Sequence, residues 1–141
     1  MLRGEGGITF IEIIVVIIIL GILATFVAPR IFGWVNEARR SQAKNQIASI
    51  ESALRLYYVD NGVYPSSEQG LAALVGPPTV GRLPTNYRTG GYMEKIPLDP
   101  WGNPYVYELQ EDGQSYEILY YGAGGQPGGE GNEQDISSKD L

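Results

Sequence analysis

The sequence contains neither cysteine nor histidine. Without cysteine the chain forms no disulfide, so its folded part must be held by an apolar core or by another device, such as a bound metal. The two absences also exclude thiol chemistry, histidine-based acid–base catalysis and histidine-ligated zinc. Basic residues are scarce in the second part of the chain: residues 61–141 carry four of the ten basic groups but eleven of the sixteen acidic ones. This acidic balance argues against nucleic acid as a partner.

Charge is almost missing from one long stretch near the amino end. Residues 8–28 are 21 positions with a single ionisable side chain, Glu12. At about 1.5 Å per helical residue, the run spans roughly 30 Å, which is the hydrocarbon thickness of a bilayer. The sequence therefore predicts a membrane-spanning helix over residues 8–29.

A cleaved secretory signal peptide is the other interpretation of this stretch. The apolar run is too long for an ordinary signal core, and no small-x-small cleavage site precedes the rest of the chain. We therefore prefer a single-pass anchor. In this interpretation a short leader, residues 1–7, lies in the cytoplasm, with Arg3 on the positive-inside side.

A helical pattern continues beyond Pro29, which we expect to bend or loosen the helix because it removes a backbone donor. In residues 30–60, apolar side chains recur at three- and four-residue steps, among them Ala43, Leu54 and Tyr57. A coiled-coil seam is the alternative, but the period does not hold for three clean heptads. This amphipathic half should instead dock on a sheet of its own domain.

Turn residues divide the remainder of the chain into short elements. Asn61 and Gly62 end the helix. Ser66 and Gln69 have the spacing of a capping box, which predicts a short second helix up to Gly76. Residues 83–104, rich in proline and glycine, should form an ordered loop. Alternating side chains then predict an antiparallel hairpin, with Tyr105, Tyr107 and Leu109 in one strand and Tyr116, Ile118 and Tyr120 in the other.

Residues 7–12, Gly-Ile-Thr-Phe-Ile-Glu, resemble the type IV prepilin processing motif: a glycine, the cleavage point, an apolar first residue and a glutamate five residues into the mature chain. The resemblance implies that a prepilin peptidase cuts between Gly7 and Ile8 and N-methylates the new Ile8 amine. The family usually has Phe where Ile8 stands. The resemblance also implies that Glu12 pairs with the amine of a neighbouring subunit during filament assembly.

The alternative for Glu12 is that its side chain extends to the lipid headgroups. An acid inside a bilayer helix costs about 2.5–3.5 kcal/mol and normally finds a partner. Headgroup contact does not explain why so apolar a run contains an acid at all. We therefore favour a role in assembly.

Motifs in the rest of the chain narrow the resemblance. They are Asp60-Asn61-Gly62 with Tyr64-Pro65, Glu68-Gln69-Gly70-Leu71, Asn86-Tyr87, Gly91-Tyr92 and Leu98-Asp99-Pro100-Trp101-Gly102-Asn103-Pro104-Tyr105. With the amino-terminal motif they resemble the major pseudopilin of the type II (general) secretion pathway, the protein G family, over nearly the whole chain. Ordinary type IV pilins share only the amino-terminal segment and carry a longer, usually disulfide-closed carboxyl-terminal region.

The resemblance implies an α+β, type IV pilin-like fold, in which a long amino-terminal helix packs on a small antiparallel sheet. The expected divisions are a leader (1–7), a transmembrane half-helix (8–29), an amphipathic half-helix (30–60) and a periplasmic head (61–141) that ends in a loop (122–141). The implied function is that of a structural subunit of the periplasmic pseudopilus filament, which supports export of folded proteins across the outer membrane.

The resemblance also implies a location and partners. The chain is expected in the bacterial inner membrane, with its head in the periplasm, and then in the filament. Its expected partners are other copies of itself, minor pseudopilins, the prepilin peptidase and the inner-membrane assembly platform. The alternative function is a type IV pilin-like filament for adhesion, motility or extracellular electron transfer, which the ten tyrosines suggest.

The segment 122–141 has two interpretations. Composition alone favours a flexible end, since six of the ten residues 122–131 are glycine. Oxygen groups there can instead converge on a hard cation, and the resemblance implies calcium. The implied ligands are Asp135, Glu133, Asn132 and the carbonyl of Tyr121. Gly124 stands where the family typically has an Asp, so we expect a weaker site.

An enzyme is the interpretation from another class. Glycoside hydrolysis uses a pair of carboxylates, and Asp99, Glu108 and Glu117 are the candidates for such a pair. Nothing in the sequence places them in one pocket. Nucleophile-elbow, phosphate-loop and dinucleotide motifs are absent. We therefore expect a structural protein without catalytic activity.

Overall fold

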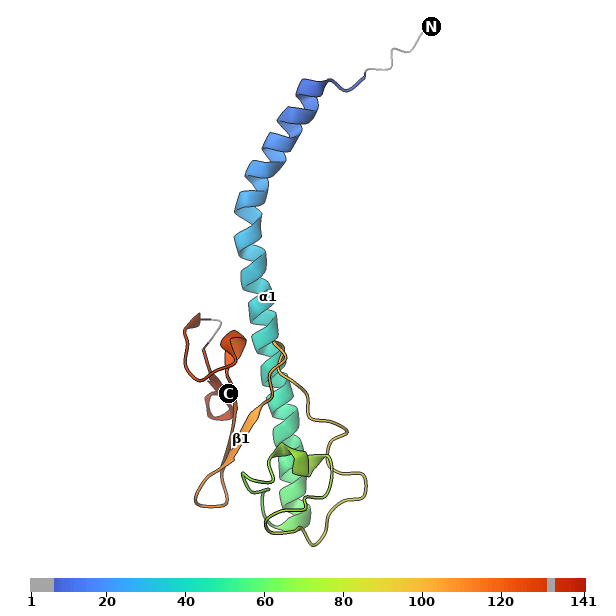
Figure 1. The fold of residues 1–141 in the computed structure, drawn as a ribbon, viewed down its shortest axis with the longest axis vertical. Helices are drawn as coiled ribbons and strands as arrows, with labels where there is room; N and C mark the ends of the chain where they lie inside the picture. The colour runs from blue at the N-terminus through green and yellow to red at the C-terminus, as the bar shows by residue number, and fades with distance from the viewer. Residues whose placement is uncertain (1–6, 132–133) are drawn as a thin grey trace. The chain divides into compact units, whose positions relative to one another are not determined.

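The computed structural model describes residues 7–131 and 134–141, with the side chains of residues 27–32 excepted. The chain divides into two compact units, Met1–Ala38, the amino-terminal unit, and Arg39–Leu141, the head unit. The helix α1 (Phe10–Asn61) begins in the first and ends in the second (Figure 1). The head unit also contains the strands β1 (Val106–Leu109), β2 (Tyr116–Tyr120) and β3 (Ile136–Ser137), and the 3-10 helices η1 (Leu71–Leu74), η2 (Gly122–Gly124) and η4 (Ser138–Asp140).

In the amino-terminal unit, α1 is formed by a nearly continuous run of isoleucine, leucine and valine. The backbone stays helical through Pro29, so the proline does not end the element, and the bend expected there stays a prediction. No helix formed by the described residues is long and apolar enough to cross a membrane. The predicted span, residues 8–29, includes positions 27–29, whose side chains lie outside the described residues.

One face of α1 forms the centre of the head unit. The buried side chains recur at three- and four-residue steps and so lie on the same side of every turn. They are Ala43, Ile47, Ile50, Leu54 and Tyr57, each at most 1% exposed. Together with Tyr107, Ile118 and Tyr120 of the sheet they form one apolar cluster. The predicted docking of this half-helix on a sheet of its own domain is confirmed.

The sheet is antiparallel, with the strand order β1-β2-β3. β1 and β2 form the predicted hairpin, in which Tyr107 pairs with Ile118. Asp112 orders the turn between them. Its carboxylate accepts hydrogen bonds from the Ser115 hydroxyl at 2.6 Å and from the backbone N–H groups of Ser115 and Gln114, both at 2.9 Å. These bonds, the hydroxyl's foremost, lower the pKa of Asp112.

The sequence does not predict the third strand. The two residues of β3 pair with Leu119 and Tyr120 of β2. Residues 136–140 are therefore ordered, although the glycine-rich composition before them favours a flexible end. The opposite edge of the sheet is β1, which is four residues long. There the backbone N–H of Leu109 donates a hydrogen bond to the Ser67 hydroxyl at 2.9 Å.

Ser66 and Gln69 form the predicted capping box. The Gln69 N–H donates to Ser66 Oγ at 3.2 Å, and the Ser66 N–H donates to Gln69 Oε1 at 3.0 Å. The helix predicted up to Gly76 is wrong in length, because the segment forms only the four-residue 3-10 helix η1. Gly70 has a φ of +60°, a backbone conformation that glycine adopts readily and that a right-handed α-helix does not accommodate.

Buried tyrosines line the core of the head unit, and their hydroxyls contact neutral acceptors. The Tyr105 hydroxyl donates to Gln46 Oε1 at 2.6 Å, and the Tyr107 hydroxyl donates to the carbonyl of Pro65 at 2.8 Å. Burial is the main reason that the pKa of each hydroxyl lies above its usual value of 10.0. Burial likewise raises the pKa of Tyr116 to about 12.

We expect the head unit to lose stability as the pH rises above 10. Unfolded tyrosines titrate near 10.0, whereas the folded ones keep their protons to higher pH. Above pH 10 the folded state therefore binds more protons than the unfolded state, and the free energy of unfolding falls as the pH rises. The stabilising difference is complete below pH 10 and is lost as the pH rises through the folded pKa values, about 12 for Tyr116.

Chemical denaturation at a series of pH values on both sides of 10 measures this decline. Tyr116→Phe removes one titrating hydroxyl and should make the decline shallower. A free energy of unfolding that stays constant as the pH rises from the usual tyrosine pKa of 10.0 towards 12 would contradict the prediction.

Candidate functional site

The predicted processing bond, between Gly7 and Ile8, lies in the short non-helical stretch before α1. Residues 1–6 of the predicted leader lie outside the described residues. Both residues at the bond are exposed, Ile8 to 71%. A Cβ built on Gly7 would meet no heavy atom within 4 Å. The chain itself therefore places no steric demand on Gly7, and another protein can approach this backbone closely.

Glu12 caps the amino end of α1. Its backbone N–H donates to Thr9 Oγ1 at 3.2 Å, and its Oε2 accepts from the Thr9 N–H at 3.4 Å. The pair forms a capping box of the Thr-x-x-Glu type, and a negative charge in the first turn also interacts favourably with the helix dipole. The sequence interpretation missed this role, although the spacing is its usual signal. A carboxylate offers about four acceptor positions, so Glu12 can cap its own helix and still receive a cation.

Large apolar side chains cover the described part of the amino-terminal unit and are exposed. Their exposed fractions run from 45% for Ile13 to 83% for Phe10. An apolar surface of this extent marks contact with lipid or with other protein, and a helix that is apolar on every side is typical of a membrane span or a bundle centre. The set comprises Ile8, Phe10, Ile11, Ile13, Val15, Val16, Ile17, Ile18, Ile19, Leu20, Ile22, Leu23 and Phe26.

Two of the four predicted calcium ligands, Tyr121 and Asp135, flank the last residue pair of the sheet. The last pair of β2 and β3 is Tyr120 with Ile136; Tyr121 follows the first of these residues in the chain and Asp135 precedes the second. Asp135 Oδ2 accepts a hydrogen bond from the Gly128 N–H at 2.9 Å. Its Oδ1 is buried and has no hydrogen-bond partner among the described residues. A buried, unpaired carboxylate oxygen is costly, and a cation would satisfy it.

The other two predicted ligands, Asn132 and Glu133, lie outside the described residues. Within residues 7–131 and 134–141, no group of three or more acidic side chains is placed to hold a metal ion. Gly124 lies in η2 and adds no carboxylate. The described residues thus offer calcium one carboxylate and backbone carbonyls, fewer than the about six to eight oxygens that it usually takes.

Direct contacts hold the segment between β2 and β3 to the rest of the head unit. Arg40 Nη1, on α1, donates to the carbonyl of Gly131 at 2.7 Å, across 91 positions of sequence, and its positive charge strengthens the bond. Gly125 packs closely against Asn103. A Cβ built on Gly125 would lie only 3.0 Å from Asn103 Oδ1. No local sequence signal predicts the Arg40 contact, since its partner is a distant backbone carbonyl.

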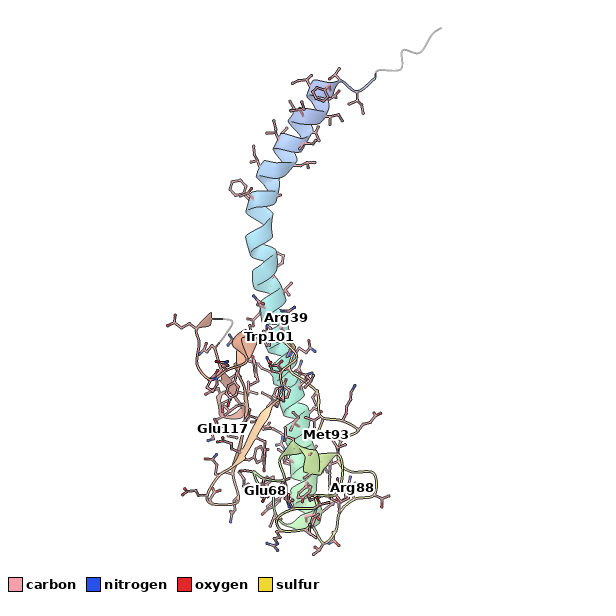
Figure 2. All side chains as sticks on the ribbon, in the orientation of Figure 1. Arg39, Glu68, Arg88, Met93, Trp101 and Glu117 are labelled. Carbon is pink, nitrogen blue, oxygen red and sulfur yellow. The ribbon has the colours of Figure 1, made fainter. Side chains whose placement is uncertain are left out.

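Two of the three carboxylates of the enzyme alternative, Glu117 and Asp99, are engaged in structural contacts. Glu108 and Glu117 lie directly opposite each other in β1 and β2. Glu117 (Figure 2) accepts hydrogen bonds from Lys139 Nζ at 2.8 Å and from the Ser137 hydroxyl at 2.6 Å. These contacts, that of Lys139 foremost, lower the pKa of Glu117. The carboxylate is therefore held as an anion and a structural acceptor.

Asp99 lies in the loop before β1 and is only 4% exposed. Its Oδ1 accepts from the backbone N–H groups of Trp101 and Asn103 at 2.9 and 2.8 Å, which orders part of the predicted proline-rich loop. A groove of about 450 Å³ beside β1 is lined by residues such as Leu98 and Tyr105 and by no carboxylate. This arrangement gives no support to hydrolysis by paired carboxylates.

Known proteins resemble the chain along nearly its whole length. The family described as type II secretion system (T2SS), protein G, matches residues 30–139. Type II secretion system core protein G of Vibrio cholerae is 45% identical over 140 residues, which are 99% of this chain and 95% of that protein. The protein of the same name from Pseudomonas aeruginosa is 44% identical over 138 residues, 98% of this chain and 97% of that one. The crystal structure of the major pseudopilin from the type 2 secretion system of enterohaemorrhagic Escherichia coli matches with a TM-score of 0.69 and 37% identity, over 78% of this chain and 94% of that chain.

Proposed function

The chain belongs to the type II secretion system protein G family, and from this premise we propose how its residues build the filament. It is a structural subunit of the periplasmic pseudopilus, which supports export of folded proteins across the outer membrane. One observation carries the mechanism: apolar side chains stay exposed along residues 8–26, whereas the head unit closes its own core. Such a helix must be covered by other molecules, and assembly into a filament provides them.

Before assembly, we propose, the lipid of the bacterial inner membrane covers this surface. Residues 8–29 then form a single span of roughly 30 Å, and the head lies in the periplasm. In the filament, neighbouring α1 helices replace the lipid, and the acidic heads form the outside. Lipid tails are as apolar as leucine, so the exchange gives little hydrophobic driving force. A polar contact must therefore direct assembly.

Glu12 supplies that contact in this proposal. It is the only ionisable side chain in residues 8–28, and an ionised group in a membrane normally pairs. Cleavage between Gly7 and Ile8 by a prepilin peptidase would create an amine on Ile8. Its positive charge complements the Glu12 carboxylate of a neighbouring copy. The N-methylation of Ile8, and the proposed minor pseudopilin and assembly-platform partners, rest on family membership alone. We propose no catalytic role, because neither motifs nor described carboxylates form a reactive site.

Loss of the chain from its own host should block export of folded periplasmic proteins to the medium. Surface attachment, motility and extracellular electron transfer should be unchanged. Enzyme assays on culture medium and periplasm measure the first effect, and re-expression of the chain provides the control. Normal export combined with a loss of attachment, motility or electron transfer would contradict the proposed function and favour the type IV pilin-like alternative.

We also propose a calcium ion at the end of β2. The unpaired Asp135 Oδ1 is the atom that supports it. The Tyr121 carbonyl, just after the last β2–β3 pair, is a second proposed ligand, although it also accepts from the Gly125 N–H at 3.1 Å. Asn132 and Glu133 are the remaining proposed ligands. When bound, the ion would neutralise the carboxylate and close the glycine-rich segment, whose ordering otherwise costs about 1–2 kcal/mol per residue.

Calcium should raise the melting temperature of a soluble head comprising residues 37–141. A ligand that binds only the folded state stabilises it by about 2.7 kcal/mol at a hundredfold excess over its dissociation constant. Asp135→Ala should reduce the rise, and Gly124→Asp should enlarge it. Arg40→Ala is the matched control: it removes a direct contact to the segment and should lower the melting temperature similarly in calcium and in chelator. Identical wild-type melting curves in calcium and in chelator would contradict the calcium site.

A further inference from the structure

The two tryptophans of the chain have opposite environments. Trp101, in the head unit (Figure 2), stacks on Tyr120 with ring centroids 5.8 Å apart and planes 17° apart. Trp34, in the amino-terminal unit, is 73% exposed. It makes no hydrogen bond or ring contact with any described residue, and the adjacent Gly33 has no side chain to cover it. Trp34 therefore presents a large apolar ring and an indole N–H donor to its surroundings.

The position of Trp34 along α1 relates it to the proposed membrane span. It lies five positions beyond Pro29, the last residue of that span, which is about 7.5 Å at 1.5 Å per residue. The headgroup layer on each side of a bilayer is roughly 5–7.5 Å thick, half the difference between the total and hydrocarbon thicknesses. Helical side chains point back towards the amino end. The indole ring thus lies closer to the hydrocarbon than its own Cα does.

The headgroup layer matches the chemistry of an indole. It is apolar on its inner side, where the ring can be buried, and it offers ester and phosphate oxygens that accept the indole N–H. Tryptophan is enriched at this depth in membrane proteins for these reasons. Water would satisfy the N–H but leave the ring exposed.

We propose that Trp34 docks in the periplasmic headgroup layer and sets the depth at which the subunit rests before assembly. The inference depends on the proposed membrane span of residues 8–29. The occupant of this surface is lipid, because Trp34 lies five positions beyond Pro29, where the proposed membrane span ends. Entry into the filament then requires withdrawal of the indole from the headgroups.

Depth-dependent fluorescence quenching tests the proposal on the full chain. The chain carries Trp101→Phe, so that Trp34 is its only tryptophan, and is reconstituted into phosphatidylethanolamine and phosphatidylglycerol vesicles. The acyl chains carry bromine, a short-range quencher, either near the headgroup or near the methyl end. A control chain with Trp101→Phe, Trp34→Phe and Ile19→Trp reports on the middle of the span, where Ile19 is 50% exposed.

We expect shallow bromine to quench Trp34 about twofold more than deep bromine, and the order to reverse for the Ile19→Trp control. If deep bromine quenches the control while neither bromine position quenches Trp34, the headgroup contact is wrong but the membrane span stands. Trp34 quenched more by deep bromine would also overturn it. An unquenched control would overturn the span and the headgroup contact together.

Discussion

A Gly7→Val chain should accumulate as uncleaved precursor in the inner membrane, with processing reduced to background. Nothing in the described structure of the chain itself requires a glycine at position 7, so the requirement must come from the peptidase. A Cβ at Gly7 would meet nothing within 4 Å, and Gly7 is not among the glycines with positive φ. A branched side chain there is therefore compatible with the fold. It would instead obstruct the close approach of the peptidase to the scissile backbone. Mass spectrometry of the chain, expressed with and without a prepilin peptidase, measures the cleavage.

Gly33→Val is the matched control, because Gly33 is also in the amino-terminal unit and a Cβ there also meets nothing within 4 Å. It adds the same side chain away from the proposed cleavage point and should be processed normally. If Gly7→Val is cut as efficiently as the unchanged chain, the assignment of the processing motif is wrong.

The second large effect concerns Glu12, whose replacement by leucine should abolish filaments while leaving membrane insertion and cleavage intact. The substitution makes the span more apolar, which favours insertion, but it removes the proposed partner of the neighbouring Ile8 amine. It also removes half of the capping box with Thr9. Loss of a cap costs about 0.5–2 kcal/mol, so Glu12→Leu alone does not separate the two roles.

Two further variants separate them. Glu12→Gln keeps a side chain that can complete the box but removes the charge. Thr9→Ala removes the capping hydroxyl and keeps the charge. If pairing with an amine drives assembly, Glu12→Gln should fail to form filaments and Thr9→Ala should form them. Filaments of normal yield from Glu12→Gln, counted by electron microscopy after release from the periplasm, would show that assembly does not depend on the charge.

Local patterns account for the parts of the fold that the sequence predicts. The buried face of α1 follows from periodicity, because Ile47, Ile50 and Leu54 must share one side of a helix. The β1-β2 hairpin follows from alternation around the turn at Asp112, whose carboxylate accepts hydrogen bonds from residues only two and three positions further on. Such contacts join neighbours in the chain, and for that reason they leave a signal in the sequence.

The missed features depend on distant partners or on backbone conformation. β3 is too short to show alternation and is a strand only because β2 lies beside it. Arg40 finds Gly131 through the tertiary fold. The positive φ of Gly70 shortens the second helix, although the capping box before it is present. For the proposed calcium site, the family resemblance implies the ligands, but only the structure shows that Asp135 has a buried carboxylate oxygen without a hydrogen-bond partner among the described residues.

The edges of the small sheet matter for subunits that are crowded together in a filament. Exposed strand edges at high local concentration invite pairing between sheets, which leads to aggregation. β1 offers only four residues, and the Leu109 N–H is occupied by Ser67. β3 is two residues long and is followed directly by η4. Short, partly occupied edges disfavour amyloid-like contacts between heads, which leaves association to the helices in the proposed filament.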